Sequence, residues 1–295
     1  MSLADHPPDA PYPKLPFWGA VGLSYSTYFG HFTDALRTSW LWMIVTAAFT
    51  AFAGWQQWSW MAAAMANLKP GLPPPMPQPT GMAVLWNLAS VLLLFAGVSI
   101  AVAWHRLMIL NEQPGFSGGN VATRNLWRYI VVAIVLFAIM FSPMAAIMLP
   151  AFYFLAPASA GPPPPGFVPI ILLTFAAYAV GIAVAFRLAL LLPARAIGNT
   201  GLTFKQAWNR SRGNVWRLFW GIVVTTMPPM LIAQIVFLVG IGPPDPGKIG
   251  GDFVAQMTAM STVFAVYYLL IVPIGIGFLS HAYRHFFVAP LDVAV

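Results

Sequence analysis

This chain has no cysteine and very little charge. The absence of cysteine excludes disulfide bonds, thiolate catalysis, thiolate metal ligands and cysteine lipidation. Charged residues make up 7% of the 295 positions, against about 25% in soluble domains. From Tyr129 to Phe186 the chain contains no Asp, Glu, Lys or Arg. A soluble fold does not leave so long a segment uncharged, because its surface would aggregate. Composition therefore predicts a membrane protein.

Hydrophobic residues make up 59% of the chain and gather in six long stretches. A helix that spans a bilayer needs roughly 20 apolar residues, so the fold class is an all-α integral membrane protein with six transmembrane helices. We expect these helices at about 39–68, 82–110, 125–156, 169–192, 214–241 and 253–287. Residues 1–38 are expected to be disordered and then interfacial, 39–289 to form the six-helix domain, and 290–295 to form a tail. The N-terminus lacks the basic and apolar regions of a signal peptide.

Positive charge is distributed unevenly between the two sides of this predicted bundle. Of the 14 Lys and Arg residues, only Lys69 and Lys248 fall in the three Pro/Gly-rich turns that join the helices pairwise. Because Lys and Arg are retained on the cytoplasmic side, the turns are predicted outside and both termini inside.

The three helix pairs resemble one another in sequence. Arg106, Arg187 and Arg284 each lie near the cytoplasmic end of the second helix of a pair, and Pro193 and Pro290 each follow their arginine by the same interval. We expect three helical hairpins, at about 39–110, 125–192 and 214–287. All three enter and leave on the same side, so the repeats are parallel and related by an axis along the membrane normal.

The longest polar, basic stretch runs from Thr203 to Arg217 and separates two very apolar halves. Thr203 and Gln206 fit a capping box, in which each side chain bonds to the other residue's backbone N–H. A short helix is therefore predicted to begin there. Its Phe204, Lys205 and Trp208 suit the headgroup zone of a membrane.

The same region carries a family resemblance, over the fourth and fifth predicted helices and their connection. The residues concerned are Arg187, Pro193, Gly201-Leu-Thr203, Ala207-Trp208, Ser211 and Gly213-Asn-Val-Trp-Arg217. This pattern resembles bacterial six-helix membrane proteins related to the membrane domain of glycerophosphodiester phosphodiesterases. In the name-giving members a separate soluble domain performs the hydrolysis, and this chain has too few carboxylates to build one. The resemblance thus implies a multi-pass module of the bacterial plasma (inner) membrane without phosphodiesterase activity.

A basic cluster is the first candidate site. Arg106, Arg187 and Arg284, with His105, His281 and His285 beside them, would converge on the cytoplasmic face if their helices face the repeat axis. Such a ring suits an anion, for example the headgroup of an anionic phospholipid, since guanidinium groups match phosphate oxygens. Alternatively, each arginine reaches to the interface by itself and no shared site exists.

The second candidate is a helix break at Pro228-Pro229, which follow Thr225-Thr226 in the fifth helix. Proline removes a backbone donor and frees a carbonyl, and transporters build binding sites at broken helices. The alternative is a kink whose carbonyls are satisfied by the threonines or by a neighbouring helix.

Two pairs of small residues, Gly97 with Ala101 and Gly181 with Ala185, have the spacing of close helix packing. We expect that packing within one chain, and a homo-oligomer interface is the alternative.

Motifs for metal, nucleotide or acid–base chemistry are absent from the sequence. We therefore expect a protein that is not an enzyme, with no cofactor and no nucleic-acid partner: a scaffold, a partner-binding subunit or a lipid-interacting module. The lipid bilayer is its expected partner, together with an unidentified protein. A small-molecule transporter or permease component is the alternative. A continuous polar cavity at mid-depth would favour transport, and a dry bundle would favour the module.

Overall fold

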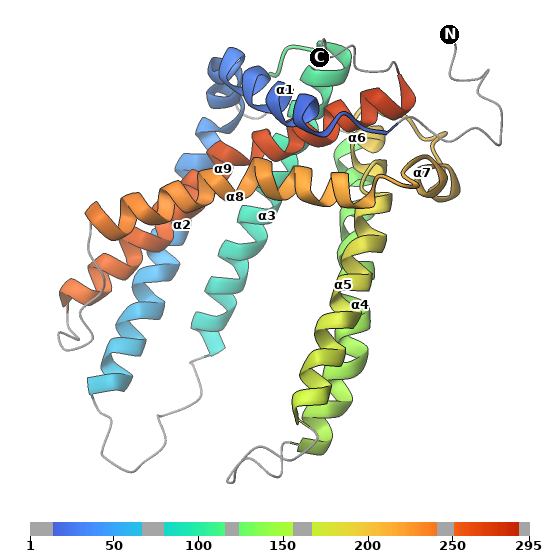
Figure 1. The fold of residues 1–295 in the computed structure, drawn as a ribbon. Helices are drawn as coiled ribbons and strands as arrows, with labels where there is room; N and C mark the ends of the chain where they lie inside the picture. Colours follow the sequence, from blue (N-terminus) through green and yellow to red (C-terminus); the bar gives the residue numbers. More distant parts are fainter. Residues whose placement is uncertain (1–13, 67–79, 116–123, 156–166, 241–250, 289–295) are drawn as a thin grey trace. The chain divides into compact units, whose positions relative to one another are not determined.

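The structure is a computed structural model, which describes residues 14–66, 80–115, 124–155, 167–240 and 251–288. Over these ranges the regular secondary structure is helical, and no strand occurs in them (Figure 1). The three proline-rich turns, the N-terminal segment up to residue 13 and the tail predicted at 290–295 lie outside the described residues. So do Lys69, Lys248 and Pro290.

The described part of the chain forms nine helices, of which six are long. They are α1 (Phe17–Gly30), α2 (Phe32–Ala66), α3 (Thr80–Leu110), α4 (Arg124–Leu155), α5 (Phe167–Leu188), α6 (Leu191–Ala196), α7 (Phe204–Arg210), α8 (Val215–Gly240) and α9 (Gly251–Phe287). The helices α2, α3, α4, α5, α8 and α9 are long and apolar enough to cross a membrane. The chain is thus a multi-pass membrane protein, as its composition predicts.

Two predicted boundaries are wrong. The first spanning helix begins at Phe32 rather than near Ser39, because a helix start tolerates Asp34, whose charge is favourable at the N-terminal end of the helix dipole. The fourth ends at Leu188 rather than at Leu192. Pro193 lies beyond that end, in the first turn of α6. The missing N–H of proline has no cost there, since the first N–H groups of a helix lack intrahelical partners.

The chain divides into two compact units. The first comprises residues 1–22, 123–223 and 278–295, and the second comprises 23–122 and 224–277. The helices α4 to α7 belong to the first unit and α2 and α3 to the second, whereas α8 and α9 contribute to both.

In the first unit, α4 and α5 lie side by side along much of their length (Figure 1). Gly181 of α5 approaches the backbone of α4 so closely that a Cβ atom there would overlap the carbonyl oxygen of Met140. For this small-residue pair, the prediction of close packing within one chain is confirmed. Small residues let helix backbones approach, which strengthens dispersion contacts where lipid supplies no hydrophobic driving force.

In the second unit, α2 and α3 pack together and α9 lies against them. Their shared core contains Ala96, Ile100 and Leu269, and Trp42, Leu93 and Tyr268 are among the side chains packed on it. Gly97 belongs to the same contact, since a Cβ atom there would lie 3.6 Å from the ring of Tyr268. Both predicted small-residue pairs therefore include a glycine that packs against another helix of this chain.

Candidate functional site

Arg187 holds the short helix α7 against the end of α5. Its guanidinium carbon lies 3.5 Å from the centre of the Trp208 ring, and Nη2 donates a hydrogen bond of 2.7 Å to the Trp208 carbonyl. The predicted capping box at the start of α7 is confirmed, with Thr203 and Gln206 bonded reciprocally. The capping box closes the start of α7, and the contacts to Trp208 fasten its second half to α5, which gives Arg187 a positioning role.

The other predicted basic residues have different surroundings. In the first unit Arg284 is exposed, whereas His281 and His285 are buried. In the second unit Arg106 forms an ion pair of 2.5 Å with Glu112, and His105 is fully buried. Arg106 belongs to a different unit from Arg187 and Arg284. The proposed ring of three arginines therefore stays a prediction.

Sequence analysis missed three arginines of the first unit that bind backbone carbonyls. Arg195 donates to the carbonyl of Leu202 at 3.0 Å, Arg210 to that of Phe286 at 2.7 Å, and Arg217 to that of Leu15 at 2.8 Å. The available signal was the scarcity of Asp and Glu around these residues. With few carboxylates nearby, arginines at helix ends find carbonyl acceptors, which lack intrahelical partners there.

The predicted break at Pro228-Pro229 is absent, since α8 is helical through both prolines and through Thr225-Thr226. The prolines still leave the carbonyls of the residues four positions earlier, Val224 and Thr225, without an intrahelical donor. The hydroxyl of Tyr25 in α1 lies 2.9 Å from the first of these oxygens and 3.4 Å from the second. A neighbouring helix thus compensates for the missing bonds, which is the alternative reading of this motif.

Helix α1 also donates hydrogen bonds to two carbonyls of α9 on either side of Pro273. Ser24 donates to the carbonyl of Ile274, and Tyr28 donates to that of Leu270 at 3.0 Å. Burial, with a smaller contribution from Tyr267, raises the pKa of Tyr28 to about 12. The same causes raise the pKa of Tyr25. Both phenols therefore remain protonated donors at physiological pH, and α1 fastens the proline-containing parts of α8 and α9 in the second unit.

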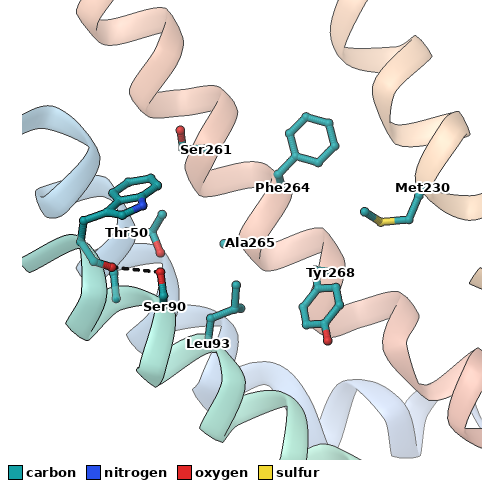
Figure 2. A pocket seen from close by; sticks show the side chains of 10 residues that line it. Thr50, Ser90, Leu93, Met230, Ser261, Phe264, Ala265 and Tyr268 are labelled. Atoms are coloured by element: carbon teal, nitrogen blue, oxygen red, sulfur yellow. Dashed lines mark hydrogen bonds between the residues drawn. The ribbon is translucent and has the colours of Figure 1, made fainter. Parts of the chain in front are cut away.

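The second unit also contains a cavity of about 380 Å³ among α2, α3, α8 and α9 (Figure 2). None of the described residues that line it carries a charge. The lining is mainly apolar and aromatic: Trp86, Ala89, Leu93, Met230, Phe264 and Ala265, together with Thr50, Ser90, Ser261 and Tyr268. Its volume falls in the range of small-molecule sites, about 300–1,000 Å³. No sequence pattern indicated this cavity, because its walls come from two helix pairs, α2 with α3 and α8 with α9, which are far apart along the chain.

The four hydroxyl groups of the lining divide into two kinds. Ser90 donates to the carbonyl of Trp86 at 3.0 Å, as Figure 2 shows, and Ser261 donates to that of Met257 at 2.8 Å. The hydroxyls of Thr50 and Tyr268 have no hydrogen-bond partner among the described residues. The cavity therefore offers a mainly apolar interior with two free hydroxyl groups.

Metal chemistry has no visible site, because the described residues contain no cluster of three His, Asp or Glu side chains. Comparisons of this chain with protein-family models, with curated proteins and with solved structures each found no match.

Proposed function

We propose that this chain is a non-enzymatic, lipid-interacting module of the bacterial plasma membrane. The observation that carries the proposal is the uncharged, mainly apolar cavity among α2, α3, α8 and α9. A molecule dissolved in the bilayer is already surrounded by apolar lipid tails, so an apolar wall alone adds little binding free energy. A cavity that fits its shape adds dispersion contacts, which mobile lipid tails do not supply. The family resemblance and the scarcity of carboxylates are consistent with this function.

The alternative, a small-molecule transporter, requires a way for a polar solute through the membrane. The mainly apolar lining supports lipid binding over transport of a polar solute, because such a solute would lose its hydration without compensation. The helix α8 is also continuous through its prolines, so of the two features that favour a transporter, the threefold repeat and a broken fifth helix, the second loses support.

Filling the cavity tests the proposal. Ala265 of α9 and Ala89 of α3 are buried in its wall, so Ala265→Phe and Ala89→Phe should each occupy part of it. We expect the purified variants to retain at most about half of the tightly bound lipid of the parent protein, measured by mass spectrometry after extensive detergent washing; cavity occupancy by an aromatic ring excludes a ligand of similar volume.

Ala255→Phe is the matched control, since Ala255 lies in the same helix but is exposed and outside the lining. It should leave the bound lipid unchanged. Equal lipid content in the parent protein and in both cavity variants would refute the proposed function, and uptake of a polar solute by proteoliposomes would support the transporter instead.

The proposal includes an orientation with both termini in the cytoplasm and three parallel hairpin repeats. Because the chain lacks cysteine, single cysteines report the orientation without background. Asn209 lies in α7 and is exposed, so Asn209→Cys is accessible to a reagent, whereas Ser211 is fully buried and unsuited to labelling. Ser159→Cys reports on the opposite side of the membrane; Ser159 belongs to the second proline-rich turn and lies outside the described residues.

On intact cells, an impermeant thiol reagent should label Ser159→Cys and leave Asn209→Cys unlabelled until the membrane is opened. We expect this pattern because 12 of the 14 Lys and Arg residues lie outside the three turns, and positive charge is retained on the cytoplasmic side. The reverse labelling pattern would invert the topology.

A further inference from the structure

We infer that the cavity of the second unit binds an uncharged, bilayer-dissolved molecule with carbonyl oxygens, which accept hydrogen bonds from Thr50 and from Tyr268. This inference rests on the proposed function and specifies its ligand. It starts from two hydroxyl groups that line the cavity and have no partner among the described residues.

The hydroxyl residues of α2 and α9 fall into two groups. Thr38 and Ser39 of α2, like Thr262 in α9, donate to the carbonyl four residues earlier. Thr46, Thr258 and Thr50 have no such bond among the described residues, and of these three only Thr50, which is 7% exposed, lines the cavity. A donor without an acceptor is costly, and Thr50 is the one of the three that a molecule in the cavity can satisfy.

Tyr268 supplies the second donor from α9. Its ring packs on the core of Ala96, Ile100 and Leu269, and it lies 3.6 Å from the position of a Cβ atom at Gly97. A phenol held by such packing loses little conformational entropy when it binds a ligand. Figure 2 shows Thr50 and Tyr268 on different helices around the same space.

The remaining lining determines the chemical class of the ligand. None of the described residues in its walls carries a charge, so the cavity cannot offset the cost of removing a charged phosphate or carboxylate group from water. A plain hydrocarbon would leave both hydroxyls unsatisfied, whereas a molecule with two carbonyl groups offers an acceptor to each. Two molecules of the bilayer carry this chemistry on an apolar body: a quinone, whose flat ring suits the aromatic walls of Trp86 and Phe264, and a neutral glycerolipid with ester groups.

Binding is measured with the full chain in nanodiscs of ether-linked phospholipid, so that the surrounding bilayer contributes no ester carbonyl. The three probes are a short-tailed benzoquinone, dioctanoylglycerol and an alkylbenzene of similar size without oxygen. We expect Thr50→Val and Tyr268→Phe each to weaken binding of at least one carbonyl probe about tenfold, which corresponds to the loss of one hydrogen bond. Affinity for the alkylbenzene should stay unchanged.

Thr46→Val is the matched control, because Thr46 is a buried threonine of the same helix outside the lining; it should bind all probes as the parent protein does. If Thr50→Val and Tyr268→Phe weaken binding of the quinone alone, or of dioctanoylglycerol alone, the affected probe identifies which molecule supplies the carbonyl. If both lining variants bind the carbonyl probes with parent affinity while Ala265→Phe excludes them, the cavity binds lipid without these hydroxyls and the inference is wrong. If Ala265→Phe also has no effect, the proposed function fails as well.

Discussion

Replacement of Gly181 by alanine is expected to force α4 and α5 apart and to destabilise the first unit. The added Cβ atom would overlap the carbonyl oxygen of Met140, which is part of a helix backbone and cannot move like a flexible side chain. Overpacking of a tight contact costs about 1–3 kcal/mol, and a backbone obstacle places this variant at the upper end. We therefore expect a clearly lower midpoint of thermal unfolding in detergent.

Gly22→Ala is the control for this substitution. Gly22 is a helical glycine of α1, and a Cβ atom there would meet nothing within 4 Å. Alanine in an open helical position stabilises by roughly 0.5–1 kcal/mol relative to glycine, so the two variants should shift the unfolding midpoint in opposite directions. Equal midpoints would mean that α4 and α5 do not approach each other as closely as this structure has them.

The second large effect is expected for Tyr25→Phe, which removes the donor that serves the carbonyls of Val224 and Thr225. Prolines 228 and 229 leave both oxygens without their intrahelical N–H, and the hydroxyl of Tyr25 is the donor described for them in this structure. A buried acceptor left unsatisfied costs about 1–3 kcal/mol. In membrane proteins a single interhelical bond averages nearer 0.6 kcal/mol, so we expect about 1–2 kcal/mol for this site. The free energy of unfolding in a denaturing detergent titration measures it.

A double-mutant cycle separates the lost hydrogen bond from lost packing. In the background Pro228→Ala with Pro229→Ala, the backbone N–H groups return and the carbonyls have intrahelical partners again. Tyr25→Phe should then cost much less than in the parent protein. Tyr178→Phe, whose hydroxyl has no hydrogen-bond partner among the described residues, should be close to neutral in both backgrounds. An equal cost of Tyr25→Phe in the two backgrounds would contradict this role of the tyrosine.

The class of the protein and its spanning helices follow from the sequence alone. Long apolar segments without charge have a single stable arrangement in a bilayer, because a helix satisfies every backbone group within the segment. The capping box of Thr203 and Gln206 was predictable for a related reason, since its two bonds connect residues three positions apart. Such features depend on local chemistry, which a sequence displays directly.

Tertiary structure decided the features that depend on distant residues. The sequence marks Pro228 and Pro229 as a weak point of α8, but only the packing of α1 shows that Tyr25 compensates for them. Likewise, nothing in the spacing of Gly181 identifies Met140 as its neighbour, and nothing in α2 alone distinguishes Thr50 from the other threonines. The physical reason is common to all three. An apolar helix face packs against many partners with similar energy, so the partner that it meets, and the cavity left between such faces, depend on the arrangement of the whole unit.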